Sequence, residues 1–575
     1  MNFNQQNNPY KQIFKSLKSI YSNKESTYRD IRDYIAPGTG LFDGSVNKAN
    51  VENDKIDYQK ILDSEPTTYM KLTVAGLYGG LVNPASRWFD LVADKTNKDY
   101  QNMDMQTVSK ALEYAKEFLY YLLARSNFYP SIYSALFEWI HYGVGVMLVE
   151  ERDYDFIFFN PLTVGEYYLG IDGKGRYTKL AREFSMTADQ MLDNFPREVL
   201  PERVIERFNA GDYETLFQVK HLICENPKDG LVSNGFKYID LYWTEEGGET
   251  VLLRKSGYYS CPIVVFELFR KNLRTIYPMG FGEQILGDVK ELQYTVKCLN
   301  LNKSYLANPA LALHTDLGRK PVLPGARFYT DQDPTKVASE IFRVSPHITE
   351  LEDSRTRLLD KIRKMTMADL LMIFAQQNKG NMTAREVTAI ANEQMTLLAP
   401  IYLQAKNGLQ AIFDRVIDIC VRRGAFPEVD GINYKDINIE FLSSIAKAQR
   451  MAEVGSIEDL ILYISQLAQV KPASLDYINE DEIVIDIAQR LGNMSKIRSR
   501  EEVEAMRQAQ AEQQQALMQQ QMQAEQMKVA KDASKAKIEP NNLLGQQILQ
   551  QGGQIPEDPH IQLEREKTLA NVPRQ

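Results

Sequence analysis

The residue types that carry acid–base, nucleophilic or metal chemistry are scattered along this 575-residue chain. Its five histidines stand far apart: His141, His221, His314, His347 and His560. Its four cysteines, Cys224, Cys261, Cys298 and Cys420, include no CxxC pair, so we expect reduced thiols and no zinc site. The sequence also has no GxSxG and no HExxH motif. We therefore predict no catalytic site, no metal and no cofactor.

Two glycine-rich stretches and one pair of aspartates are weaker candidates for chemistry. Residues 279–282 (MGFG) open a predicted helix but lack the dinucleotide fingerprint, and residues 170–175 (GIDGKG) lack the GxxxxGK[ST] spacing. The tip of a hairpin explains the second stretch better than a phosphate loop does. Asp331 and Asp333 could begin a paired-carboxylate metal site, but a turn before Pro334 is favoured.

The one segment that suggests contact with nucleic acid is a short polar loop. It comprises Gln376, Gln377, Asn378, Lys379, Gly380, Asn381 and Met382. Lys379 is its only cation, and tight binding to phosphates needs several. Such a loop could touch a DNA backbone without gripping it and without recognising its sequence. An ordinary surface loop is an equally good interpretation of this segment alone.

A very long helix must position this loop. Thr383 and Glu386 have the spacing of a capping box, which marks a helix start. An apolar stripe follows at helical spacing for about ten turns: Val387, Ala391, Leu398, Ile401, Ala405, Ile412, Val416 and Ile419. Pro400 lies inside the stripe, where it removes a hydrogen bond and predicts a kink. A polar loop on a long kinked helix suits a lever or strut better than an enzyme pocket.

The remaining chain predicts an α+β fold that is predominantly helical. Helices are expected up to Tyr142, including one from Met105 to Tyr142 that breaks at Pro130. Between about residues 144 and 270 the apolar period changes towards two, which predicts a series of strands with a tight turn at Asp172-Gly173. Helical spacing returns in residues 281–307 and from residue 351 to about residue 374, with a few short strands between them.

Charge and hydropathy limit the possible surroundings. The formal net charge is −9 and the pI about 5.4, which argues against strong nonspecific adhesion to nucleic acid. No window approaches the run of about 18 apolar residues that a membrane span needs, and the N-terminus lacks a secretory signal. We therefore expect an intracellular, soluble chain.

Several motifs, in order along the chain, resemble the portal proteins of tailed bacteriophages, the head-to-tail connectors of short-tailed, podovirus-like phages. The motif MTAxEV at residues 382–387, before the Pro-interrupted helix, is similar to that family. Weaker matches cover most of residues 30 to 510: RDYIAP (32–37), AGL (75–77), NPASRWF (83–89), NPL (160–162), GEYY (165–168), REF (182–184), MTA (186–188), GFG (280–282), DVK (288–290) with Leu292, and NPA (308–310).

The resemblance implies an elongated portal-type subunit with wing, stem, clip and crown, assembled into a ring, usually of twelve copies. The implied regions are an N-terminal helical and α+β wing (1–278), a first stem helix (279–307), a clip (308–350), a second stem helix (351–375), a tunnel loop (376–382), a long kinked wing helix (383–425) and a helical crown (426–530). Outside the resemblance, composition predicts a disordered tail (531–575). In a ring, the apolar end of the second stem helix would pack against two neighbours.

The implied function is non-enzymatic. The ring would sit at one capsid vertex of the virion, assemble in the host cytoplasm, and form the channel through which double-stranded DNA is packaged and ejected. Its partners would be other copies of the chain, the terminase motor, tail adaptors, and the major capsid and scaffolding proteins, with no membrane. Two alternatives stay open at this point: a nucleotide-driven DNA translocase subunit, and a helical tail or ejection protein of the virion.

Overall fold

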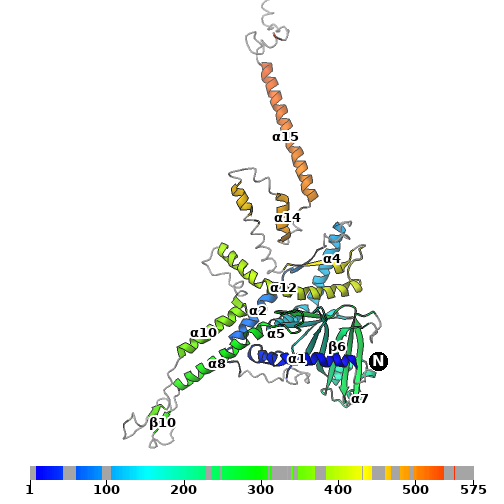
Figure 1. Cartoon of the computed structure of the whole chain (residues 1–575). Coiled ribbons are helices and arrows are strands. Elements are labelled where there is room, and N and C mark those ends of the chain that lie inside the picture. The colour runs from blue at the N-terminus through cyan, green and yellow to red at the C-terminus, as the bar shows by residue number, and fades with distance from the viewer. Residues whose placement is uncertain are drawn as a thin grey trace, which may run out of the picture. The chain divides into compact units, whose positions relative to one another are not determined.

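The structure is a computed structural model. It describes residues 8–42, 60–92, 105–227, 235–246, 249–307, 311–313, 333, 338–340, 348–369, 384–429, 432–442, 457, 460–467, 479–490, 498, 500–535 and 550. The chain divides into two compact units, Met1–Tyr477 and Ile478–Gln575. As predicted, the described residues form an α+β fold that is mainly helical (Figure 1).

A long N-terminal helix, α1 (Pro9–Tyr34), begins the first unit. The side chain of Asn8 caps it by accepting a hydrogen bond of 2.9 Å from the Tyr10 amide. Its buried face carries aromatic and aliphatic residues at helical spacing: Tyr10, Phe14, Leu17, Tyr21, Tyr28 and Ile31. Helix α2 (Glu65–Leu81) and strand β1 (Phe89–Val92) follow.

Two helices, α4 (Met105–Arg125) and α5 (Phe128–Tyr142), occupy the segment predicted as one helix broken at Pro130. The position of the break was wrong, because α4 ends before Ser126 and Pro130 lies in the first turn of α5. The missing N–H of a proline costs nothing in a first turn, since the amides there have no intrahelical partner.

The predicted strands form two antiparallel sheets. Strands β2 (Val144–Arg152), β3 (Phe156–Leu162) and β9 (Ile263–Glu267) make a three-stranded sheet in the order β3-β2-β9. The second sheet has the order β4-β5-β6-β7-β8, with β4 (Tyr167–Ile171), β5 (Tyr177–Thr187), β6 (Leu216–Glu225), β7 (Tyr238–Glu246) and β8 (Glu249–Tyr258). The turn predicted at Asp172-Gly173 connects β4 and β5, and the Asp172 carboxylate accepts the amides of Lys174 and Arg176 at 2.8 Å.

Helices cover both faces of the five-stranded sheet. On one face the Phe14 ring of α1 meets Trp243 edge-on at 5.3 Å. The other face carries a smaller core built with α6 (Ala188–Asn194) and α7 (Glu202–Asn209), which includes Met191 and Val204. Each face of the sheet therefore has a hydrophobic cluster packed against it.

The second half of the first unit consists mainly of long helices. These are α8 (Phe281–Ala307), α10 (Ile348–Met365) and α12 (Ala384–Arg422). Between α8 and α10, β10 (Leu311–Leu313) pairs antiparallel with β11 (Ala338–Glu340). After α12, β12 (Asn438–Phe441) pairs antiparallel with β1, with Phe89 opposite Phe441.

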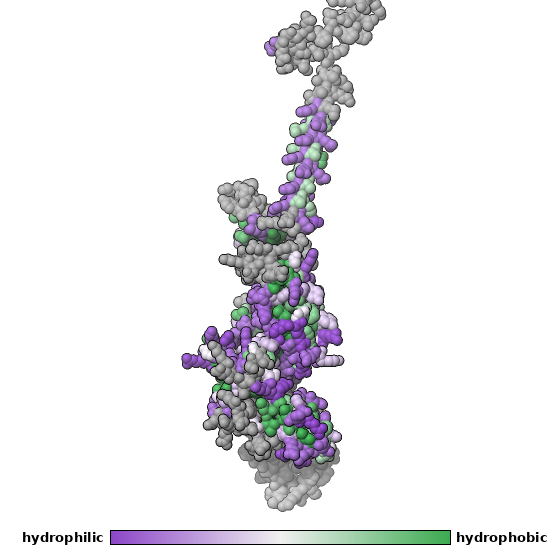
Figure 2. All heavy atoms as spheres, turned by 90° about the vertical axis from the view of Figure 1, so that its right-hand side faces the viewer, coloured by the Kyte–Doolittle hydropathy of each residue, from purple (hydrophilic) through white to green (hydrophobic). Residues whose placement is uncertain are grey.

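The second unit contains α14 (Glu480–Arg490) and α15 (Arg500–Lys535). Figure 2 shows mostly hydrophilic residues with scattered hydrophobic ones along α15. Leu517, Met518 and Met522 of this helix are exposed. This helix continues through residues 531–535, and the disorder predicted for the tail stays a prediction. Within the described residues, no helix is both long and apolar enough to cross a bilayer.

Candidate functional site

The predicted loop from Gln376 to Met382 lies outside the described residues, as do Lys379 and Thr383. Of Glu386 the structure describes the helical backbone but not the side chain. The capping box and the exposure of the loop therefore stay predictions. The structure does describe what holds the loop at each end: the pair α8–α10 on one side and helix α12 on the other.

Helices α8 and α10 run antiparallel, side by side (Figure 1). Two ion pairs fix this direction, because Asp288 near the start of α8 meets Lys361 near the end of α10 at 2.6 Å. Lys303 near the end of α8 meets Glu352 near the start of α10 at 3.0 Å. Both pairs are exposed, so each contributes little to stability. The predicted stripe of α8 is confirmed, since all its members are buried: Ile285, Val289, Leu292, Val296 and Leu299.

A buried glutamine attaches this helix pair to the rest of the first unit. Oε1 of Gln293 accepts hydrogen bonds from the amides of Leu62 at 2.8 Å and Asp63 at 2.9 Å. Its Nε2 donates to the Asp63 carbonyl at 2.9 Å. The Asp63 carboxylate in turn accepts from Arg355 of α10 at 2.7 Å. Gln293 and Asp63 therefore connect α8, α10 and the segment before α2.

The chain turns sharply where α10 ends. The helix was predicted from residue 351 to about residue 374, but α10 begins at Ile348 and ends at Met365, and after a two-residue turn Ala368 and Asp369 are helical again. Met367 has φ +57°, a left-handed conformation that is unfavourable for a side chain with a Cβ. The Thr73 hydroxyl of α2 donates to the Thr366 carbonyl at 2.9 Å, which holds this turn against the body. The apolar residues 370–374 that we expected to complete the helix lie outside the described residues.

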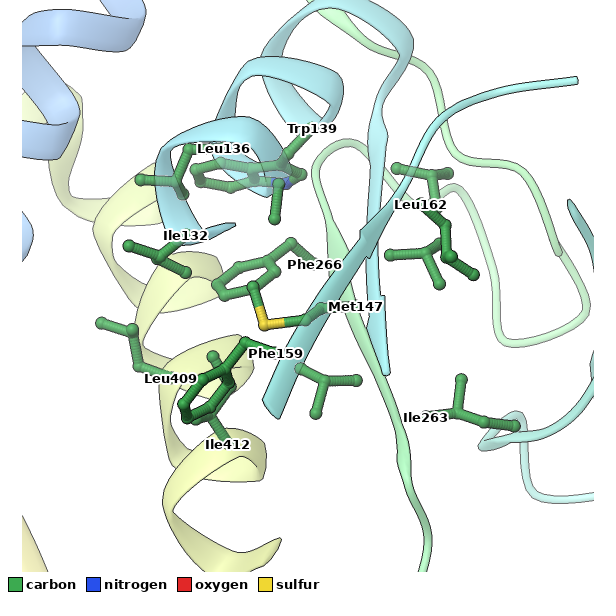
Figure 3. Packing of buried hydrophobic residues seen from close by; sticks show 14 of the residues in the cluster. Ile132, Leu136, Trp139, Met147, Phe159, Leu162, Ile263, Phe266, Leu409 and Ile412 are labelled. Atoms are coloured by element: carbon green, nitrogen blue, oxygen red, sulfur yellow. The ribbon is translucent and has the colours of Figure 1, made fainter. Parts of the chain in front are cut away.

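Helix α12 follows the predicted loop in the sequence, and Pro400 lies inside this helix as predicted. The predicted stripe is buried at the residues whose side chains are described: Leu398, Ile401, Ala405, Ile412, Val416 and Ile419. Figure 3 shows Leu409 and Ile412 of α12 beside Phe159 of β3, with Phe266 of β9 and Ile132 of α5 close by. The helix therefore packs into the main hydrophobic core.

One glycine lets α12 approach the sheet closely. A Cβ added to Gly408 would lie 2.3 Å from a ring carbon of Phe266, nearer than any real side chain comes. By contrast, a Cβ at Gly287 of α8 would meet nothing within 4 Å. The glycine at 408 is thus explained by packing.

Charged groups fix the C-terminal end of α12. Asp418 accepts hydrogen bonds from Lys435 at 2.6 Å, Ser260 at 2.7 Å and Arg422 at 3.1 Å. Burial alone would raise the pKa of Asp418, but these three donors outweigh it and lower that pKa to about 2. Nε of Arg423 also donates to the Glu151 carboxylate of β2 at 2.8 Å. This end of the helix is therefore locked to the body.

The weaker candidates for chemistry have structural explanations. A Cβ at Gly280 would lie 2.3 Å from the Gly143 amide nitrogen, so close packing explains the glycine before α8. His221 lies 2.6 Å from the buried Asp240. The four cysteines are free, and the described residues contain no group of three potential metal ligands. Asp331 lies outside the described residues, and Asp333 is exposed.

Sequence reasoning missed the Gln293–Asp63 connection and the charged cluster at the end of α12. The two members of the first are 230 positions apart, and no local signal marks either of them. For the second, only the run of basic residues after Asp418 could have served as a hint.

Comparison with known proteins places these elements in context. A family model described as "Bacteriophage head to tail connecting protein" matches residues 7–498. A portal protein of Salmonella phage epsilon15 is 28% identical over 514 residues, covering 86% of this chain and 90% of the relative. A probable portal protein of Bordetella phage BPP-1 is 26% identical over 483 residues, covering 81% and 84%.

Among solved structures, similarity is found to a chain in the virion of a native gene transfer agent particle. That chain is 10% identical, with a TM-score of 0.31, and the match covers 74% of this chain and 94% of that one. A chain in the neck of the native particle, computed with C12 symmetry, is 9% identical with a TM-score of 0.31, covering 73% and 90%. A TM-score this low does not show a shared fold.

Proposed function

Because this chain belongs to the family of bacteriophage head to tail connecting proteins, we propose that it is the portal of its phage, a ring at one capsid vertex. A connector joins head to tail and so contacts capsid and tail proteins. The observation that carries the proposal is the match to portal proteins over more than four fifths of the chain. The ring would contain twelve copies, act without enzymatic chemistry of its own, and receive DNA from a separate terminase motor.

An exposed apolar stripe on α8 supports assembly with further copies. Tyr294, Leu301 and Tyr305 are 69%, 49% and 52% exposed, and Cys298 lies between them at helical spacing. They lie on the opposite side of α8 from the stripe that packs against α10. Single exposed apolar residues are ordinary, but a row of large ones marks an interaction surface. In the ring, this stripe would contact the stem of the neighbouring subunit.

The long helices give the proposed ring its mechanism. Helix α12 is locked at its C-terminal end, and the predicted DNA-facing loop from Gln376 to Met382 precedes its N-terminal end. The turn at Met367 and the anchored pair α8–α10 hold the other side of that loop. We place the stem at α8 and α10, the clip between them, the wing before residue 279 and in α12, and the crown after residue 426. A polar loop with one cation would let DNA slide past.

Electron microscopy of the purified full chain tests the proposal. Rings with a central hole are expected. Images that contain filaments or monomers and no rings would refute the proposal. The double substitution Tyr294→Ser with Leu301→Ser should reduce ring formation, whereas Tyr213→Ser, an exposed tyrosine away from α8, should leave it intact. Equal ring yields from both variants would show that the exposed stripe of α8 is not part of the interface between subunits.

A second experiment tests the loop. Deleting residues 378–381 should leave rings intact while impairing DNA packaging or retention, because the deletion removes only the proposed contact with DNA. A phage carrying this deletion that packages and retains DNA normally would show that the loop does not face the DNA path.

A further inference from the structure

A charged cavity of about 930 Å³ lies at the C-terminal end of α12. One wall is a face of the five-stranded sheet, with Asp240 and Tyr242 of β7 and Arg254 of β8. The facing wall consists of the end of β2 and the last turns of α12 with Arg415. The volume is that of sites which take small molecules. The proposed portal function does not use this cavity.

The side chains that line the cavity carry more positive than negative charge. Six arginines line it: Arg152, Arg182, Arg254, Arg415, Arg422 and Arg423. The carboxylates of the lining are four: Glu150, Glu151, Asp153 and Asp240. Two further carboxylates, Glu166 and Asp418, pair with lining arginines from outside. The lining itself has two more arginines than carboxylates, and these two outside carboxylates balance them, whereas the whole chain has a net charge of −9.

Arg415 is the most informative of these arginines. Its side chain is only 2% exposed, and its nearest carboxylate contact, Asp418, is at 3.7 Å, beyond hydrogen-bond distance. Its short hydrogen bond is to a neutral hydroxyl, that of Ser260, at 2.5 Å. Burial and the nearby Arg422 lower the pKa of Arg415. Arg415 therefore forms only a long ion pair with Asp418, which the Ser260 hydroxyl bridges, and its Nε donates to the Val149 carbonyl at 3.4 Å. An anion in the cavity would give this buried guanidinium a closer charged partner.

Two carboxylates of the lining each have two cationic or imidazole partners. Glu151 accepts from both Arg422 at 2.7 Å and Arg423 at 2.8 Å. The carboxylate of Asp240 accepts from Arg254 at 3.2 Å while it also lies 2.6 Å from His221. Arginines that share one acceptor retain donors for a further anion, since each guanidinium carries five N–H groups.

Aromatic rings next to the arginines indicate the kind of anion. Arg254 lies over the Tyr242 ring at 4.2 Å, and Arg415 lies near the Tyr258 ring at 5.4 Å. Stacking holds a guanidinium plane in place, so its fork is ready for a phosphate. A DNA duplex carries a charge every ~1.7 Å of its axis, and the four carboxylates of the lining would repel such a polyanion. A small molecule with one phosphate group suits the cavity better.

We propose that this cavity binds a phosphate-bearing small molecule, with Arg254 and Arg415 as donors to the phosphate. The phosphate group would belong either to inorganic phosphate or to a nucleotide, and a nucleotide base would lie against the tyrosine rings of the lining, Tyr242 and Tyr258. The bound phosphate would sit between α12 and the five-stranded sheet and join them.

Isothermal titration of the full-length chain tests this proposal, with sodium phosphate, sodium pyrophosphate and AMP at one ionic strength. Saturable binding of at least one of them, at about one site per chain, is expected. Arg254→Gln should weaken that binding about tenfold, because one charge-assisted contact is lost. Arg254 is 43% exposed, so this variant is expected to fold. Arg415→Gln should weaken binding at least as much where circular dichroism shows it folded.

The matched control is Arg207→Gln. Arg207 is 50% exposed and pairs with Asp212 at 3.1 Å, as a surface arginine outside the cavity. The Arg207→Gln variant should bind each probe with the same affinity as the unmodified chain. AMP binding tighter than phosphate would identify a nucleotide, and equal affinities would identify inorganic phosphate. No binding of any probe, or equal weakening by Arg207→Gln and Arg254→Gln, would overturn the proposal.

Discussion

Replacing Gln293 with alanine should loosen the helix pair α8–α10 from the body of the first unit. The substitution removes the hydrogen-bond partner of the amides of Leu62 and Asp63 and of the Asp63 carbonyl. Asp63 is buried, so its two backbone groups would lack a partner, whereas water can reach the exposed Leu62. Each unpaired buried group costs about 1–3 kcal/mol, so the local cost should be about 2–6 kcal/mol.

Hydrogen exchange measured by mass spectrometry is the suitable assay, because a chain with two compact units does not unfold in one step. Peptides that cover residues 60–68 and 285–300 should lose protection by about 30-fold or more, since ~1.4 kcal/mol corresponds to a factor of ten. Peptides from the five-stranded sheet should keep theirs. Lys297→Ala, an exposed position on the same helix, is the control. Unchanged protection around Asp63 in Gln293→Ala would refute the anchoring role of this glutamine.

Three further predictions follow from single residues. Gly408→Ala should lower the melting temperature, because its Cβ would meet the Phe266 ring at 2.3 Å, whereas Gly287→Ala, with nothing within 4 Å, should raise stability by about 0.5–1 kcal/mol. Burial raises the pKa of Glu138 from 4.5 to about 7, so the folded state holds its proton more tightly than the unfolded state. The stabilisation that Glu138 contributes is fully present below about pH 4.5 and falls by ~3 kcal/mol as the pH rises to about 7. In calorimetric melts, Glu138→Gln should lose that part of the pH dependence of stability. A profile identical to that of the unmodified chain would contradict the raised pKa of Glu138. Met367→Gly should stabilise the turn after α10 by about 1 kcal/mol, because glycine adopts φ +57° without strain, and faster exchange at that turn would contradict this.

Local patterns predicted most of the regular elements. The strands between residues 144 and 267 were confirmed because alternating side chains reflect a sheet whose two faces differ. The stripe of α8 and the second half of the stripe of α12 were confirmed because helical spacing reflects one buried face. Proline positions were less reliable as predictors of helix breaks. Pro130 and Pro400 both lie inside helices, and only the position in the helix decides whether the ring disrupts it.

The end of α10 shows where local patterns fail. Apolar residues up to 374 favoured one uninterrupted helix, yet α10 stops at Met365 and a two-residue turn separates it from the helical Ala368 and Asp369. At this turn the Thr366 carbonyl accepts a hydrogen bond from Thr73, which lies 293 positions earlier in the chain. Periodicity contains no information about such a partner.

The sequence by itself predicted an α+β fold, because the period of apolar residues is a local property, and its ordered motifs resemble the phage head-to-tail connector family that the family comparison then showed. It also predicted a polar loop before a long helix, which stays a prediction for residues 376–382. Only the tertiary structure decided which distant residues meet: Gln293 with Asp63, β1 with β12, and the arginines of α12 with the sheet. Those contacts depend on how the chain returns upon itself, and hydrogen bonds and ion pairs between distant residues leave no periodic trace in a sequence.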